Sequence, residues 1–156
     1  MSASGTDEPD PPRLLARCDG ALSLEPSTLE WLAGHSGALA VLTVAGPARS
    51  GKSSLLNALY PTSAAFGVGE TVASCTRGIW ARLLPPSEAG APPILLLDTE
   101  GLGAPEAAAP QRDPQLFALA ALLSSVLVYN CMGVVDDYAI QRLGQFCSLA
   151  KQLIAA

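Results

Sequence analysis

Eight residues beginning at Gly46 carry the clearest chemical pattern in the chain. They read Gly-Pro-Ala-Arg-Ser-Gly-Lys-Ser and fit the motif G-x-x-x-x-G-K-[ST]. Glycines let backbone N–H groups curl around an anion, and the lysine reaches the outer phosphates of a nucleotide as a point charge. The final serine offers a hydroxyl to Mg²⁺ and opens a helix whose positive end faces the phosphates. The motif predicts a phosphate-binding loop with contacts from Gly46, Arg49, Ser50, Gly51, Lys52, Ser53 and Ser54.

A second pattern, Asp98-Thr99-Glu100-Gly101, directly follows the apolar residues 94–97. Proteins with a phosphate-binding loop hold Mg²⁺ through an aspartate at the end of a buried strand. A glycine three residues later can donate its backbone N–H to a γ-phosphate. Taken singly, D-x-x-G is more often a strand-ending turn. Here it comes 46 residues after Lys52, in the expected chain order, so the pair predicts a nucleotide site with Asp98 on the metal.

The segment between these motifs, residues 62–78, is long, irregular and rich in hydroxyl groups. It contains Thr71, Ser74 and Thr76. Nucleotide switches need a loop hydroxyl that completes the Mg²⁺ shell when the γ-phosphate is present. By position any of the three could serve, although each one singly is more simply a solvated turn residue.

Alternating strands and helices are expected to position these motifs. Apolar, β-rich segments predict buried strands at residues 38–45, 94–97 and 126–130, with a further strand at 79–84. Helices are expected at residues 54–60, 116–123 and 136–156. This alternation predicts an α/β fold, with a mostly parallel sheet and helices on both faces.

The N-terminal part has local signals of its own. Residues 1–12 contain three prolines and several acidic residues and are expected to form a disordered arm. Asp19-Gly20 lies between short apolar runs and predicts a hairpin. Ser27, followed three residues later by Glu30, predicts a capping box that opens a short helix.

Length and composition exclude several classes of protein. The 156 residues suit one domain, and 49% hydrophobic with 15% charged residues excludes a disordered chain. The net charge of −5 argues against binding to nucleic acid. A single histidine is too few for a multi-histidine metal site and argues against a His-based triad. The four cysteines are scattered, which excludes zinc-site spacing and favours reduced thiols in the cytoplasm. The uncharged residues 116–135 could span a bilayer, but they change from helix-like to strand-like midway and favour a soluble core.

Four longer strings carry a resemblance to a known family. They are FGVG at 66–69, TVASCTRGIW at 71–80, LLDTEGLG at 96–103 and LLSSVLVYN at 122–130. With the phosphate loop, they resemble the G domain of guanylate-binding proteins and atlastins, which are dynamin-like large GTPases. The similarity extends from about residue 20 to about residue 150, and the D-T-E-G-L-G and T-x-G-I-W segments are not features of small G proteins.

The resemblance implies a P-loop NTPase fold and a role for each matching residue. Arg49 would be an arginine finger supplied in cis, Ser74 would position the attacking water, and Glu100 would belong to the water network. It also implies GTP as substrate, Mg²⁺ as cofactor, and a nucleotide-dependent homodimer of G domains. Small G proteins place Gln directly after D-x-x-G, whereas this chain has Leu102 there. The implied metal ligands are Ser53, Thr76 and Asp98.

The base-reading motif of the family has no counterpart in the sequence. The family reads guanine with an Arg-Asp pair on a strand downstream of the Tyr129 strand, and the chain ends at Ala156. Arg112-Asp113 lies before that strand, and no N-K-x-D occurs. We therefore expect residues 13–156 to form a C-terminally truncated G domain with no segment that inserts into a membrane. The alternatives are a weak or inactive nucleotide-binding isoform that associates with full-length relatives, and another P-loop enzyme, which T-x-G-I-W argues against.

Overall fold

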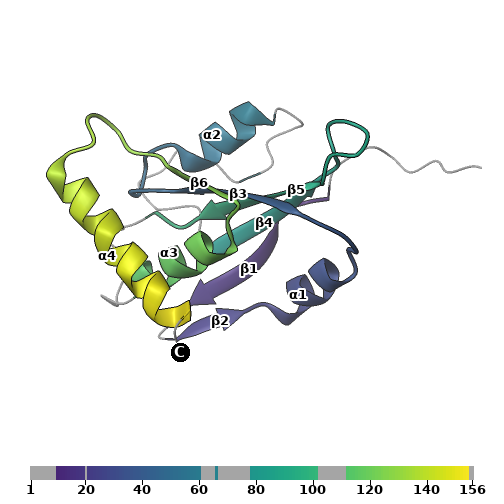
Figure 1. Cartoon of the computed structure of the whole chain (residues 1–156), viewed down its shortest axis with the longest axis horizontal. Coiled ribbons are helices and arrows are strands. Elements are labelled where there is room, and N and C mark those ends of the chain that lie inside the picture. The colour runs from purple at the N-terminus through teal and green to yellow at the C-terminus, as the bar shows by residue number, and fades with distance from the viewer. Residues whose placement is uncertain (1–9, 20, 61–65, 67–77, 102–111, 155–156) are drawn as a thin grey trace, which may run out of the picture.

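The structure is a computed structural model that describes residues 10–19, 21–60, 66, 78–101 and 112–154 (Figure 1). Its elements follow one another in the order β1 (Arg13–Cys18), β2 (Leu22–Leu24), α1 (Pro26–Ala33), β3 (Ala40–Ala45), α2 (Lys52–Leu59), β4 (Ile79–Leu84), β5 (Ile94–Thr99), α3 (Arg112–Leu123), β6 (Val126–Tyr129) and α4 (Asp137–Ile154).

The six strands form one mixed sheet in the order β2-β1-β4-β5-β3-β6. Strands β5, β3 and β6 are paired in parallel, whereas the β2–β1, β1–β4 and β4–β5 pairs are antiparallel. Four strands share one direction, and only β2 and β4 run against them. The predicted α/β fold is confirmed, with the parallel pairing confined to the half of the sheet that carries the phosphate loop.

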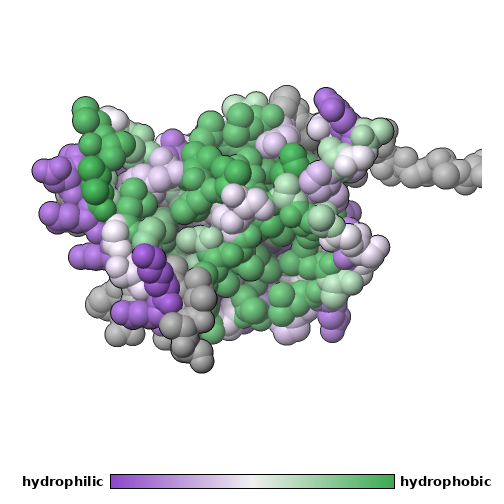
Figure 2. Space-filling model, in the orientation of Figure 1, coloured by the Kyte–Doolittle hydropathy of each residue, from purple (hydrophilic) through white to green (hydrophobic). Residues whose placement is uncertain are grey.

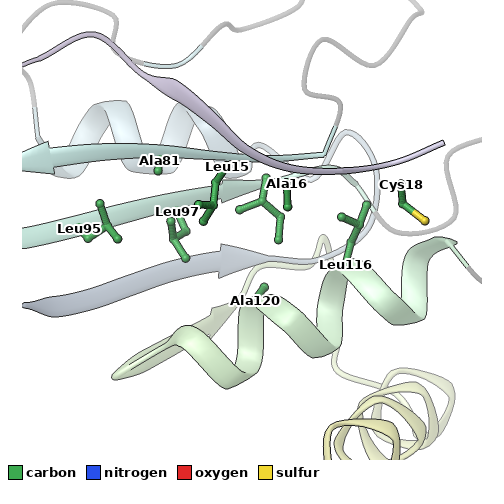
Figure 3. Packing of buried hydrophobic residues seen from close by; sticks show 9 residues of the cluster. Leu15, Ala16, Cys18, Ala81, Leu95, Leu97, Leu116 and Ala120 are labelled. Atoms are coloured by element: carbon green, nitrogen blue, oxygen red, sulfur yellow. The ribbon is translucent and has the colours of Figure 1, made fainter. Parts of the chain in front are cut away.

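Helices cover both faces of this sheet (Figure 1). Helix α2 lies on one face, where Leu56 packs against Val44 and Leu96. Helices α1 and α3 lie on the other face, and α4 packs against α3. A second buried cluster lies on this face and includes the strand residues Leu15, Leu95 and Leu97. Figure 3 shows Leu116 and Ala120 of α3 directed toward them. Each buried leucine side chain contributes about 1.5–3 kcal/mol by leaving water, so the two clusters hold the strand ends in a fixed place.

The long uncharged segment does change from helix to strand, as predicted, where α3 ends and β6 begins. Its two serines bind β3: the Ser124 hydroxyl donates to the Thr43 hydroxyl at 2.6 Å, and the Ser125 N–H donates to the Val41 carbonyl at 2.9 Å. Among the helices that the structure describes, none combines the length and apolar character needed to cross a bilayer.

Two local predictions need correction. The capping box is wrong, because α1 begins at Pro26 after Glu25, and no side chain caps it. Proline suits the first helical position, since the N–H that it lacks would have no partner in the helix, and Ser27 therefore lies inside the first turn. Strand β6 is not fully buried either. It pairs with β3 at one end of the sheet, and Val126 is 56% exposed.

Candidate nucleotide-binding site

The site lies at the carboxyl ends of β3 and β5, which are neighbours in the parallel half of the sheet. Their register pairs Val44 with Asp98. The loop that follows β3 and the segment that follows β5 therefore begin side by side. The crevice at the carboxyl ends of parallel strands is the usual ligand position in open α/β sheets.

Residues 46–51 form a loop with unusual backbone conformations. Gly46 and Gly51 have φ angles of +148° and +85°, and Arg49, at +62°, is the one non-glycine residue with positive φ in the described part of the chain. Helix α2 begins directly after Gly51 without a side-chain cap. The N–H groups of a first helical turn have no partner within the helix, so this end of α2 can bind an anion.

Lys52 is buried beneath this loop, with only 6% of its surface exposed. Its ammonium group donates to the Pro47 carbonyl at 2.8 Å, which places the lysine along the loop rather than in solvent. Burial lowers the pKa of Lys52, and the nearby carboxylates of Asp98 and Glu100 act in the opposite direction. A positive charge held where little water screens it interacts strongly with a phosphate.

Ser53 and Asp98 meet beside the lysine. The Ser53 hydroxyl donates to Oδ2 of Asp98 at 2.6 Å, and Asp98 is 1% exposed. Hydroxyl and carboxylate oxygens are the ligands that Mg²⁺ prefers, so the chemistry of this pair fits that cation. The buried hydroxyl of Ser50 has no hydrogen-bond partner within the described residues, which fits a loop built around a polar ligand.

The segment after β5 is fixed to two other parts of the molecule. Oε2 of Glu100 accepts a hydrogen bond from the Gly78 N–H at 2.9 Å, and the Glu100 N–H donates to the Gly78 carbonyl at 2.7 Å. The next residue, Gly101, packs so closely on the loop that a Cβ atom there would lie 2.2 Å from Cα of Ala48. The D-x-x-G segment thus lies against the phosphate loop and against the start of β4.

The structure therefore brings together most of the residues that the sequence singled out. Lys52 and Ser53 begin α2, whereas Asp98, Glu100 and Gly101 lie at the end of β5 or directly after it, and all but Ser53 are buried. The residues at the rim, Arg49 and Ser54, are exposed on the loop and on the first turn of α2. Ser74 and Thr76 lie outside the described residues, so their roles stay predictions.

One residue of this region was missed by the sequence reasoning. Asn130, which directly follows β6, donates from its side-chain amide to the Ser50 carbonyl at 2.7 Å. Its position after a strand that neighbours the phosphate-loop strand was the available signal. The contact itself joins residues 80 positions apart, which no local pattern reveals.

Comparison with known proteins supports the resemblance. The family model "Guanylate-binding protein, N-terminal domain" matches residues 19–156. Guanylate-binding protein 2 of Homo sapiens is 37% identical over 147 residues, which cover 94% of this chain and 25% of that protein. Guanylate-binding protein 5 of Mus musculus is 39% identical over 145 residues, which cover 93% of this chain and 25% of that protein.

Guanylate-binding protein 1 of Chlorocebus aethiops is 37% identical over 140 residues, covering 90% of this chain and 24% of that protein. The chain thus spans about a quarter of the length of the curated relatives that it matches. Because the family model covers most of the chain, and because the phosphate loop and the D-x-x-G segment lie together, the chain belongs to the guanylate-binding protein family.

Proposed function

We propose that the chain binds the phosphates of GTP together with Mg²⁺ and forms part of a GTP-hydrolysing module. The observation that carries this proposal is the contact between Ser53 and Asp98 beside the buried Lys52. Relatives named as guanylate-binding proteins support a guanine nucleotide as the ligand. Free thiols at Cys18, Cys131 and Cys147 fit a reducing compartment such as the cytoplasm.

In this proposal one set of groups binds the phosphates of the nucleotide and another set binds the metal ion. The N–H groups at the start of α2 and the ammonium of Lys52 bind the phosphates, while Ser53, Asp98 and Thr76 hold the metal. When bound, Mg²⁺ would neutralise negative charge on the phosphates.

Three further residues would serve hydrolysis itself. The guanidinium of Arg49 stabilises charge that develops in the transition state, which is the usual role of an arginine finger. Ser74 and Glu100 orient the attacking water. Charge stabilisation by groups already in place is commonly the largest contribution to catalysis of this kind.

A second candidate function is nucleotide binding with little hydrolysis, in association with longer relatives. It is favoured by one contact, because the carboxylate of Glu100 is engaged by the Gly78 N–H. Single-turnover hydrolysis separates the two candidates. Conversion of bound GTP to GDP by this chain at the rate of a full G domain would exclude the second.

The proposed partner is a second G domain that pairs face to face across the nucleotide. The segments proposed to respond to the γ-phosphate are residues 62–78 and 101–114, of which 112–114 belong to α3. Ultracentrifugation should show a higher mass with a transition-state mimic than with GDP. An equal mass with both nucleotides would contradict the pairing.

The chain's two lysines allow a matched test of nucleotide binding. Lys52→Ala should weaken the binding of a fluorescent GTP analogue by about 100-fold or more, because a charge-assisted contact in a poorly solvated site is lost. Lys151→Ala, which changes an exposed lysine of α4, should bind like the unmodified chain. Equal affinity in all three proteins would contradict the proposal.

The same assay measures base preference. Phosphate contacts do not read the base, so unlabelled GTP and ATP should compete for the 156-residue chain with affinities within about tenfold of each other, a difference of ~1.4 kcal/mol. Strong selectivity for GTP would show that this chain contains base-reading residues that we have not identified.

A further inference from the structure

We infer that Asn130 is a positioning residue that holds the phosphate loop in its anion-binding shape. The inference rests on the proposed function and adds to it a residue that lies outside the sequence motifs. Asn130 follows β6, and the pairing of Tyr129 with Ala45 ends both strands in register. The first residue after β6 therefore lies beside Gly46, the first residue of the loop.

The main chain of Asn130 fixes the entrance of the loop. Its N–H donates to the Ala45 carbonyl at 2.7 Å, which extends the β3–β6 ladder up to the loop. Its carbonyl oxygen lies 2.0 Å from the place where a Cβ of residue 46 would be. Gly46 is thus required by the close approach of the Asn130 peptide as well as by its φ of +148°.

The side chain of Asn130 reaches the far end of the same loop. Its Nδ2 donates to the Ser50 carbonyl at 2.7 Å. The C=O and the following N–H of a trans peptide point in opposite directions. Holding the Ser50 carbonyl on Asn130 therefore turns the N–H of Gly51 to the opposite side, and keeps the negative end of this peptide away from a ligand in the loop.

The loop needs such support because it has little of its own. Arg49 has a positive φ, which a non-glycine residue keeps only where the surroundings enforce it. Gly46 and Gly51 also have positive φ, and as glycines they leave the backbone free to take other conformations unless contacts restrict it. Its internal hydrogen bond from the Ser50 N–H to the Pro47 carbonyl is long, at 3.4 Å. If the binding-competent shape is populated less often, the apparent affinity falls by the same fraction.

Two variants of Asn130 separate the donor from the volume of the side chain. Asn130→Ala removes both, whereas Asn130→Asp keeps the shape and replaces the donor by a carboxylate beside the Ser50 carbonyl. Both should weaken the binding of a fluorescent GTP analogue by about 10- to 100-fold, the effect of leaving one partly buried carbonyl without its partner.

Asn57→Ala is the matched control. Asn57 also clamps backbone through its amide, with Nδ2 donating to the Phe66 carbonyl and Oδ1 accepting from the Phe66 N–H, both at 3.0 Å. The Asn57→Ala variant should lower the melting temperature about as much as Asn130→Ala does. Its nucleotide affinity should differ from that of the unmodified chain by less than about threefold. Asn130 variants that bind within about twofold of the unmodified chain would overturn the inference. If the unmodified chain itself fails to bind nucleotide, the proposed function and this inference fail together.

A measurement on the unmodified chain covers the case in which the variants do not fold. In NMR spectra, the side-chain amide protons of Asn130 should exchange with water at least about tenfold more slowly than those of Gln141, which is exposed on α4. Equal exchange rates would show that the Ser50 contact is not formed in solution, and would overturn the inference.

Discussion

Arg49 combines an exposed side chain with a left-handed backbone. Its φ of +62° costs a non-glycine residue roughly 1–2 kcal/mol. Glycine would occupy the same conformation at no steric cost. The presence of arginine at this position is therefore explained by its side chain, which fits the proposed role as an arginine finger.

Arg49→Gly should separate catalysis from binding. Glycine preserves the shape of the loop, so nucleotide affinity should stay within a few-fold, while hydrolysis should slow by about 10³ or more. Arg49→Ala should slow hydrolysis equally and should also bind like the parent, because alanine bears at this φ only the strain that arginine already bears. Single-turnover hydrolysis and nucleotide titration measure both effects. Equal turnover by Arg49→Gly and the parent would show that Arg49 is an ordinary surface residue with no part in hydrolysis.

Lys52 should make stability depend on alkaline pH. Its pKa is lowered from 10.5 chiefly by burial. Between the lowered value and 10.5, the unfolded chain keeps a proton that the folded chain has released, so the free energy of unfolding rises with pH. Urea titrations of the nucleotide-free chain between neutral pH and pH 10.5 should show a smaller rise for Lys52→Met. Lys151→Met should follow the unmodified chain, and identical pH profiles for all three would contradict the burial of Lys52.

At the scale of the elements, Gly78 joins three strands at the edge of the site. It directly precedes β4, exchanges two hydrogen bonds with Glu100 after β5, and has φ of +79°. A Cβ at this position would lie 2.1 Å from the carbonyl oxygen of Ala16 in β1. The backbone of β1 therefore leaves room for glycine alone at this position.

Gly78→Ala should cost far more stability than Gly90→Ala. Gly90 has nearly the same φ, +88°, but nothing lies within 4 Å of its added Cβ. Gly90→Ala should lose only the roughly 1–2 kcal/mol of the positive φ, whereas Gly78→Ala should lose at least about 3 kcal/mol because the β1 backbone must also shift. Urea denaturation of the two variants measures the difference, and equal losses would refute the close packing on β1.

At the scale of the whole molecule, apolar side chains gather around the β6 edge. Figure 2 shows them over the middle of the face that includes β6 and along the connection from β6 to α4. Among the strands that the structure describes, β6 has one neighbour in the sheet, β3, and β6 contains neither proline nor charge. Such edges favour pairing with another chain. The exposed large hydrophobic residues of this region are Leu122, Leu123, Val126, Met132, Val134, Val135 and Ile140.

The 156-residue chain by itself should therefore self-associate, and one charge on this edge should reduce the association. Val126→Lys places a charge on the most exposed residue of β6, which should lower the weight-average mass in ultracentrifugation while leaving the circular dichroism spectrum unchanged. Leu22→Lys, on the opposite edge strand β2, is the control and should change the mass little. A monomeric unmodified chain would contradict this expectation.

Much of this architecture follows from local sequence. The G-x-x-x-x-G-K-[ST] motif fixes a strand, a loop and a helix in order, since each of its positions has a backbone or ligand requirement. The change from alanine-rich to β-branched residues after Leu123 marks the end of α3 and the start of β6. Asp19-Gly20 marks the β1–β2 hairpin, whose strands pair as expected. Backbone conformational preferences and the spacing of hydrophobic residues act over a few neighbouring residues, so both can be recognised in the sequence alone.

The tertiary structure decided everything that depends on strand order and register. Pairing of β3 with β5 places the phosphate loop beside Asp98, and pairing with β6 brings Asn130 to the far end of that loop. These outcomes arise from contacts between distant segments, whose energies depend on the assembled sheet and core rather than on any local pattern.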